Sequence, residues 1–147
     1  MAIAERSAQT TWKGSLARGE GTLTGGSGAL GELPVTWASR TERSDGKTSP
    51  EELIAAAHAS CFSMALSHEL TQAGNEPERL DVTAVVTLDR VGDAPTVTRS
   101  ALTVSGRVPG IDAAAFAAAA KGAGRNCPIS RLLAGGSAEI TVDATLT

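Results

Sequence analysis

Two cysteines are the residues of this chain whose type could support covalent chemistry. Cys61 and Cys127 are its only cysteines among 147 residues, and they are far apart in the sequence. Inside a cell the glutathione pool keeps structural disulfides reduced. The two thiols are therefore inert core residues, metal ligands or a catalytic pair, and we predict that they form a redox pair.

The composition of the chain limits its domain organisation, its cellular location and its partners. A chain of 147 residues with 41% apolar content is expected to form a single domain over residues 1–147. The segment Met1–Arg6 soon turns polar, and no apolar run approaches the ~20 residues that span a bilayer, so we predict a cytoplasmic protein. The net charge of −3 and the absence of Tyr argue against nucleic acid as a partner, and no basic amphipathic helix suggests a membrane surface.

A long helix is expected to carry Cys61. Ser49, Pro50 and Glu52 form a capping box with proline at the first helical position, and the helical pattern continues to about Gly74. The middle of this helix is apolar nearly all round, so it must be covered on every side. One small sheet cannot supply that cover, and we predict that a second subunit does so in a homodimer.

Cys61 needs help from other residues to be reactive. Its apolar neighbours raise the pKa of a thiol, so a nucleophile there requires a cation beside it. Arg40, at the end of a strand expected from Val35 to Arg40, is a candidate. Glu51 lies ten residues before Cys61, about 15 Å along a continuous helix. It can serve Cys61 only if the helix breaks or if the glutamate comes from the other subunit.

Local rules favour reactivity at Cys127 over Cys61. Asn126-Cys127-Pro128 places the sulfur near the N-terminus of a short helix expected over residues 129–133, where the helix dipole favours a thiolate. Pairing with Cys61 requires that the loop before Cys127 folds back over the long helix, which the sequence permits.

His58 precedes Cys61 by three residues and shares its helix face. A Cys-His pair could act as in a cysteine protease, and His58, Cys61, Cys127 and His68 could bind zinc. There is no close pair of ligands of the CxxC kind, however, and we favour a hydrogen-bonded structural role for His58.

The remaining elements are mostly strands. Alternating patterns predict strands over 8–16, 33–39, 80–88, 102–108 and 138–146, and Asp112 caps an alanine-rich helix. Residues 26–31 spell GxGxxG, but they lead into Pro34 and a strand pattern, so we predict a hairpin loop and not a nucleotide site. The order βββ-α-ββ-α-β predicts an α+β fold with mostly antiparallel sheets packed around the long helix.

Two segments together are similar to the OsmC/Ohr family of thiol peroxidases. Residues 49–66 read SPEELIAAAHASCFSMAL and resemble the signature of that family, in the wording of its OsmC branch. Residues 126–130 read NCPIS and resemble its second-cysteine motif. The resemblance implies an intertwined homodimer with two active sites at the subunit interface, and chemistry without a metal or flavin.

Carried over position by position, the resemblance assigns four catalytic residues. Cys61 matches the peroxidatic cysteine, Cys127 the resolving cysteine and Glu51 the active-site glutamate. Arg40 resembles the active-site arginine, with Arg43 as its rival because the segment after Arg40 varies in length within the family.

The resemblance also implies a reaction. Cys61 attacks an organic hydroperoxide, its sulfenic acid condenses with Cys127, and an external dithiol, such as a lipoyl group, resets the disulfide. Alkyl or fatty-acid hydroperoxides are the expected substrates. The competing hypothesis is a non-enzymatic module on the same fold that senses redox state or binds a small apolar ligand.

Overall fold

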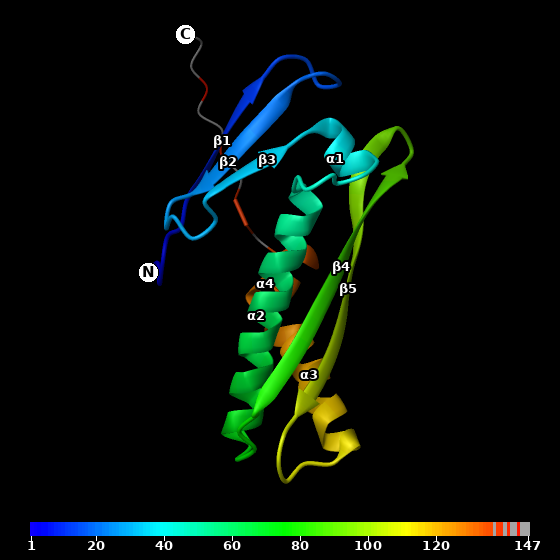
Figure 1. Ribbon diagram of the computed structural model, residues 1–147. Coiled ribbons are helices and arrows are strands. Elements are labelled where there is room, and N and C mark those ends of the chain that lie inside the picture. The colour runs from blue at the N-terminus through cyan, green and yellow to red at the C-terminus, as the bar shows by residue number, and fades with distance from the viewer. Residues whose placement is uncertain (137, 140, 142–143, 145–147) are drawn as a thin grey trace. The chain divides into compact units, whose positions relative to one another are not determined.

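The computed structural model describes residues 1–136, 138–139, 141 and 144. In this part of the chain the elements follow in the order β1 (Ala8–Lys13), β2 (Glu20–Gly25), β3 (Glu32–Val35), α1 (Trp37–Thr41), α2 (Pro50–Gln72), β4 (Arg79–Val91), β5 (Ala94–Arg107), α3 (Ala113–Asn126) and α4 (Pro128–Leu133) (Figure 1). The fold is α+β with antiparallel strands, as predicted. The closing strand predicted over 138–146 falls largely on positions outside the described residues.

The chain divides into two compact units. The first unit comprises Met1–Ile54 and Val86–Arg99, and the second comprises Ala55–Val85 and Ser100–Thr147. Each unit is described by itself below.

The sheet of the first unit is antiparallel with the strand order β1-β2-β3. Ala8 pairs with Gly25 and Lys13 with Glu20 at the two ends of the first ladder. The GxGxxG segment connects β2 to β3, and Gly28 and Gly31 both have positive φ, at +79° and +63°. This segment is the predicted hairpin loop, and its glycines serve the turn.

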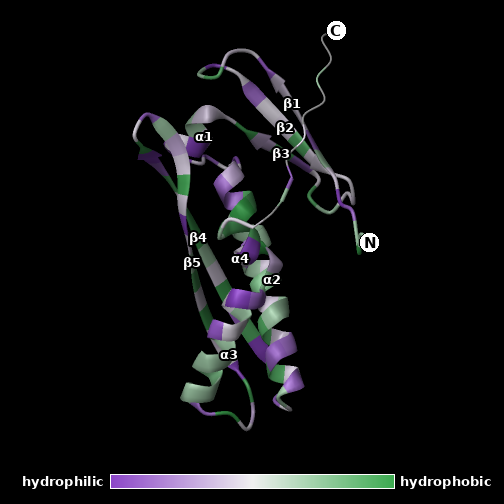
Figure 2. Cartoon of the chain, turned by 180° about the vertical axis from the view of Figure 1, so that it is seen from behind, coloured by the Kyte–Doolittle hydropathy of each residue, from purple (hydrophilic) through white to green (hydrophobic). Residues whose placement is uncertain are grey.

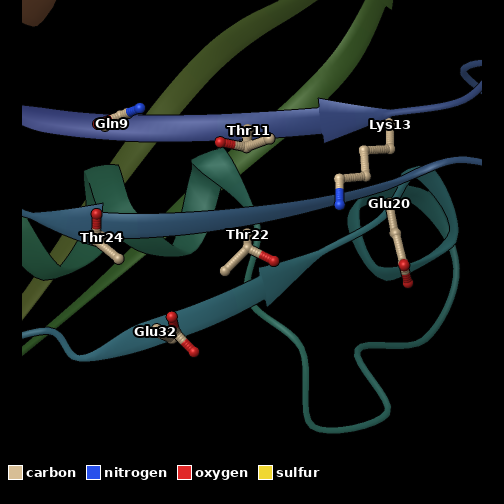
Figure 3. A pocket seen from close by; sticks show the side chains of 7 residues that line it. All are labelled: Gln9, Thr11, Lys13, Glu20, Thr22, Thr24 and Glu32. Atoms are coloured by element: carbon tan, nitrogen blue, oxygen red, sulfur yellow. The ribbon is translucent and has the colours of Figure 1, made fainter.

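The two faces of this sheet differ in polarity. Alternation along the strands places Leu23, which is buried, on the face opposite the polar one. Figure 3 shows the polar face, whose side chains come from all three strands. Its members are Gln9, Thr11, Lys13, Glu20, Thr22, Thr24 and Glu32.

A short helix corrects the predicted strand from Val35 to Arg40. The strand β3 ends at Val35, and Thr36 caps α1: the backbone N–H of Ser39 donates to Thr36 Oγ1 at 3.0 Å, and that of Thr36 donates to Ser39 Oγ at 2.9 Å. The reciprocal bonds satisfy two backbone donors that a helix start leaves free. Arg40 therefore lies on a helix and not at a strand end.

The long helix α2 begins where the capping residues predicted, although the Glu52 side chain binds Thr48 and not the backbone of Ser49. The backbone N–H of Glu52 donates to Ser49 Oγ at 3.1 Å, while the Glu52 carboxylate accepts from the hydroxyl of Thr48 at 2.7 Å. The helix is continuous from Pro50 to Gln72 and is followed by Gly74 at φ +82°. It does not break between Glu51 and Cys61.

The core of the second unit lies along one side of α2. Phe62, Leu66 and Leu70 recur every fourth residue, and they form a buried cluster with Ala123 and Cys127. Burying such a Leu or Phe side chain stabilises the fold by about 1.5–3 kcal/mol. Side chains of the hairpin β4-β5 and of α3 pack against this cluster, and Figure 1 shows these elements beside α2.

The opposite side of α2 is open in the single chain. Ala56, Ser60 and Met64, again four residues apart, are exposed, and Met64 retains 68% of its accessible surface. The predicted cover on every side is thus not supplied by this chain's described residues, and the homodimer stays a prediction.

The helices that follow the hairpin position Cys127. Asp112 caps α3 by accepting from the backbone N–H of Ala115 at 2.8 Å, and the first turns of α3 are alanine-rich and coloured green in Figure 2. Cys127 ends α3 and is also the N-cap of α4, with Pro128 in the first turn. Among the described residues, no helix combines the length and the apolar character needed to cross a bilayer.

Candidate active site

Arg40 and Glu51 form a bidentate ion pair in the first unit. Arg40 Nη2 donates to Glu51 Oε1 at 2.8 Å, and Arg40 Nε donates to Glu51 Oε2 at 3.2 Å and also lies 3.0 Å from Oε1. The side chain of Glu51 is 10% exposed and that of Arg40 is 30% exposed. Two parallel bonds fix the guanidinium plane, so its remaining N–H groups point in a defined direction.

The other candidate arginine has a different setting. The side chain of Arg43 is 86% exposed, and its nearest carboxylate is that of Asp45, 3.8 Å away. A pair this exposed contributes little to stability or orientation. The geometry thus distinguishes a held arginine, Arg40, from a solvated one.

An apolar cavity lies beside Arg40 within the first unit. It measures about 370 Å³, and the side chains that line it include Trp12, Leu23, Trp37 and Leu53 together with Arg40. The guanidinium carbon of Arg40 stands 5.9 Å from the centroid of the Trp37 ring, within range of a cation–π interaction. The cavity offers an apolar wall with one cationic group.

Cys61 and Cys127 come together in the second unit, as predicted from the fold-back of the chain. Both are free thiols. Cys127 is completely buried in the core cluster, and Cys61 is partly buried against the same cluster. The structure therefore brings Arg40 to Glu51 and Cys61 to Cys127, each pair within its own unit.

The two thiols have opposite tendencies to ionise. Burial raises the pKa of Cys61, and the hydrogen bond to Cys127 raises it further, while the backbone N–H of Ile129 opposes the effect. Burial also acts to raise the pKa of Cys127, but the Ser130 N–H, Cys61, the Ser130 hydroxyl and the Ile129 N–H outweigh it, and the pKa falls. Cys127 is the better thiolate by its local surroundings, in the direction that local rules predicted.

His58 is a buried histidine, 4% exposed, with both ring nitrogens in hydrogen bonds. Nδ1 lies 2.6 Å from Ser100 Oγ, and Nε2 lies 2.8 Å from Ser130 Oγ. The prediction of a hydrogen-bonded histidine is confirmed. The predicted zinc alternative finds no support, because both ring nitrogens already have partners and the described residues contain no cluster of metal-ligating side chains.

Sequence reasoning missed the two serines and the tryptophan of these sites. Ser130 carried a usable signal, because it lies in the first turn of the short helix whose N-cap is Cys127. Trp37 could have been found from the Thr36–Ser39 capping pair, which places it and Arg40 on one short helix. Ser100 is 42 residues from His58 and carries no local signal.

Comparisons with known proteins give one consistent result. Residues 43–143 match the family described as OsmC-like protein. The chain is 46% identical over 138 residues to a protein named Peroxiredoxin OsmC from Escherichia coli, covering 94% of each chain. A protein of the same name from Shigella flexneri matches equally well.

Solved structures with the same fold carry related names. The organic hydroperoxide resistance protein OhrB of Bacillus subtilis aligns with a TM-score of 0.65 at 23% identity, over 88% of this chain and 91% of that one. An organic hydroperoxide resistance protein OsmC from Legionella pneumophila aligns with a TM-score of 0.67 at 23% identity, over 92% and 93%. At these identities the likeness establishes the fold.

Proposed function

Because this chain belongs to the OsmC-like protein family, we propose that it is a thiol-dependent peroxidase that reduces organic hydroperoxides to alcohols. The observation that carries the proposal is the meeting of Cys61 and Cys127 as free thiols in one core, in a chain 46% identical to a peroxiredoxin. Each thiol affects the pKa of the other, and this mutual influence supports a disulfide between them in the catalytic cycle.

The reaction proceeds in three balanced steps. The thiolate of Cys61 attacks one peroxide oxygen, the O–O bond breaks, and the alkoxide takes a proton and leaves as the alcohol. Cys127 then attacks the sulfenic acid of Cys61, which forms the disulfide and releases water. An external dithiol reduces the disulfide by thiol exchange and leaves as its own disulfide.

Arg40 and Glu51 serve Cys61 in this proposal. Arg40 supplies the positive charge that the surroundings of Cys61 lack, and Glu51 holds the guanidinium in orientation through the bidentate pair. Arg40 is preferred to Arg43 because Arg43 is exposed and held by no such pair.

The active protein is a homodimer in which Glu51 reaches the thiol of the other subunit. The continuity of α2 supports this arrangement, because Glu51 and Cys61 of one helix stand about 15 Å apart. The open side of α2 supplies apolar surface for a partner at Ala56 and Met64. A monomeric mass in sedimentation at micromolar concentration would contradict the dimer.

The substrate and reductant follow from the chemistry of the surfaces. The apolar cavity beside Arg40 suits an alkyl or fatty-acid chain with its polar peroxide end toward the guanidinium. A dithiol such as a lipoyl group suits the last step, since it closes a stable ring on oxidation. The need to reduce this pair of thiols in each cycle supports a location in the reducing cytoplasm.

The test follows the loss of cumene hydroperoxide with a dithiol reductant in wild type, Cys61→Ser and Cys127→Ser. We expect Cys61→Ser to abolish turnover, because the nucleophile is gone. Cys127→Ser should react once and then accumulate sulfinic acid on Cys61 under excess peroxide, because the reversible exit from sulfenic acid has been removed.

Two outcomes would contradict the proposal: full activity in Cys61→Ser, or an unmodified Cys61 by mass spectrometry in peroxide-treated Cys127→Ser. A parallel assay after chelator treatment checks the metal-free mechanism and should leave the rate unchanged. The Arg43→Ala variant serves as the matched control, because its side chain is exposed and outside the site.

A further inference from the structure

The reaction described above gives His58 no task, although the histidine joins three elements. It belongs to α2, and its ring nitrogens meet Ser100 of β5 and Ser130 of α4 at 2.6 Å and 2.8 Å. All three residues belong to the second unit, together with both cysteines. A buried polar group with two short bonds from distant segments is costly to misplace.

The charge state of the ring limits how hydrogens can be arranged. Burial lowers the pKa of His58, so the imidazole is neutral and has one N–H donor and one acceptor nitrogen. Each serine hydroxyl has a single hydrogen to donate. The chain Ser100-His58-Ser130 can therefore be oriented in one of two directions.

The two directions differ in whether the Ser130 hydroxyl can donate its hydrogen to Cys127. Ser130 is the third residue of α4, whose N-cap is Cys127. Its hydroxyl is one of the groups that lower the pKa of the Cys127 thiol. If Nδ1 carries the proton, the Ser130 hydroxyl donates its hydrogen to Nε2 and has none left for the sulfur. If Nε2 carries the proton, Nε2–H donates to Ser130, and the hydrogen of Ser130 is free to point to the sulfur.

We propose that His58 is a positioning residue for the resolving cysteine: it accepts from Ser100 at Nδ1, donates from Nε2 to Ser130, and so turns the Ser130 hydroxyl to donate to the Cys127 thiolate. The thiolate is thereby stabilised before it attacks the sulfenic acid of Cys61. In that attack the S–S bond forms, the S–O bond breaks, and the leaving hydroxide takes a proton to become water. The kinetic part rests on the proposed function.

Other ionisable groups near Cys127 are few and do not replace this hydroxyl. Cys61 of α2 faces the sulfur directly. Glu69 of α2 accepts a hydrogen bond at 2.9 Å from the amide of Asn126, the residue before Cys127. Arg125 of α3 and Arg131 of α4 are exposed and solvated.

The first test titrates a single thiol and does not involve peroxide. In Cys61→Ser the only cysteine is Cys127, so thiolate absorbance at ultraviolet wavelengths against pH reports its ionisation alone. Adding Ser130→Ala should move the curve to higher pH, and adding His58→Gln should do the same. Adding Ser105→Ala, which removes an exposed serine on the same strand as Ser100, should leave it in place.

An unchanged titration curve in Ser130→Ala would overturn the proposal. Ser130 is half-buried, and its replacement by alanine is conservative. The Ser130→Ala variant therefore keeps the test available if the buried His58→Gln variant does not fold.

The second test identifies the tautomer. The chain has two histidines, and ¹⁵N chemical shifts of the imidazoles distinguish a protonated from an unprotonated ring nitrogen. His68→Gln removes one set of signals and assigns the other to His58. We expect a neutral ring with the proton on Nε2 in the reduced protein, and a proton on Nδ1 would contradict the proposed direction.

The third test addresses rate. After a pulse of peroxide, disulfide formation in Ser130→Ala should be about tenfold slower than in wild type at pH 7, the effect expected for one lost bond to a charged group. The rates should converge at high pH, where Cys127 is ionised in both proteins, and a difference that persists there would indicate a merely structural defect. If wild type does not react with peroxide, the proposed function fails while the titration and the tautomer still decide this inference.

Discussion

The two units of this chain divide the requirements of a thiol peroxidase between them. The second unit holds both cysteines, and its local groups lower the pKa of Cys127 and raise that of Cys61. The first unit holds a fixed cation, Arg40, in a bidentate pair with a nearly buried Glu51 beside an apolar cavity. By these local groups alone, the thiol of Cys127 would ionise at lower pH than that of Cys61.

The opposite pKa directions of the two thiols indicate why Cys61 needs a cation such as Arg40. A peroxidatic cysteine must be a thiolate when the peroxide arrives, and burial works against that state at Cys61. In the proposed mechanism, the charge of Arg40 overcomes this effect of burial. We therefore propose that Arg40, in the first unit, lowers the pKa of a thiol that the groups of the second unit raise.

The largest expected effect comes from removing that cation. Arg40→Ala should lower kcat/KM for cumene hydroperoxide by about a hundredfold, because one preorganised donor to the reacting atoms is lost. Steady-state assays measure it, and Arg43→Ala is the control, expected to stay within about twofold because its side chain is 86% exposed. Equal losses in both variants would mean that net charge, and not the held guanidinium, matters.

A second, smaller effect sharpens the comparison by asking which thiol the cation serves. In the Cys127→Ser background, Arg40→Ala should raise the pKa of Cys61, seen as thiolate absorbance that develops at higher pH. In the Cys61→Ser background the same substitution should leave Cys127 unmoved, because its thiolate depends on Ser130 and Ile129. A shift confined to Cys127 would reverse the proposed assignment of roles.

Local signals in the sequence predicted most of the elements correctly. The Ser49 cap, Asp112 and the prolines at Pro50 and Pro128 each set a helix start that the structure reproduces. These signals act through backbone groups a few residues away, so the sequence alone contains them. The short helix α1 was missed because the alternation through Val35 and Trp37 suits a strand, while the Thr36 and Ser39 bonds favour a helix.

The sequence predicted which residues make up the candidate site, but not the hydrogen bonds that connect His58 to distant residues. Cys61, Cys127, Arg40 and Glu51 were found from residue type, context and family resemblance, and the structure brings them together as two pairs. The partners of His58 are 42 and 72 residues away in the chain, and such contacts depend on tertiary packing. No sequence spacing typical of a helix or a strand connects His58 to Ser100 or Ser130.

The smallest expected effect concerns stability, and it distinguishes the buried histidine of the second unit from its exposed one. The pKa of His58 is lowered by burial, so below its ordinary value of 6.5 the unfolded chain binds a proton that the folded protein excludes. The contribution is therefore fully present above about pH 6.5 and is lost as pH falls, by at most about 1.4 kcal/mol per pH unit. Urea unfolding between pH 7.5 and pH 5 measures it. His58→Asn should flatten this dependence relative to wild type, whereas His68→Gln, at an exposed position, should keep it. Parallel curves for wild type and His58→Asn would show that the imidazole binds a proton as readily in the folded protein as in the unfolded chain, which its burial argues against.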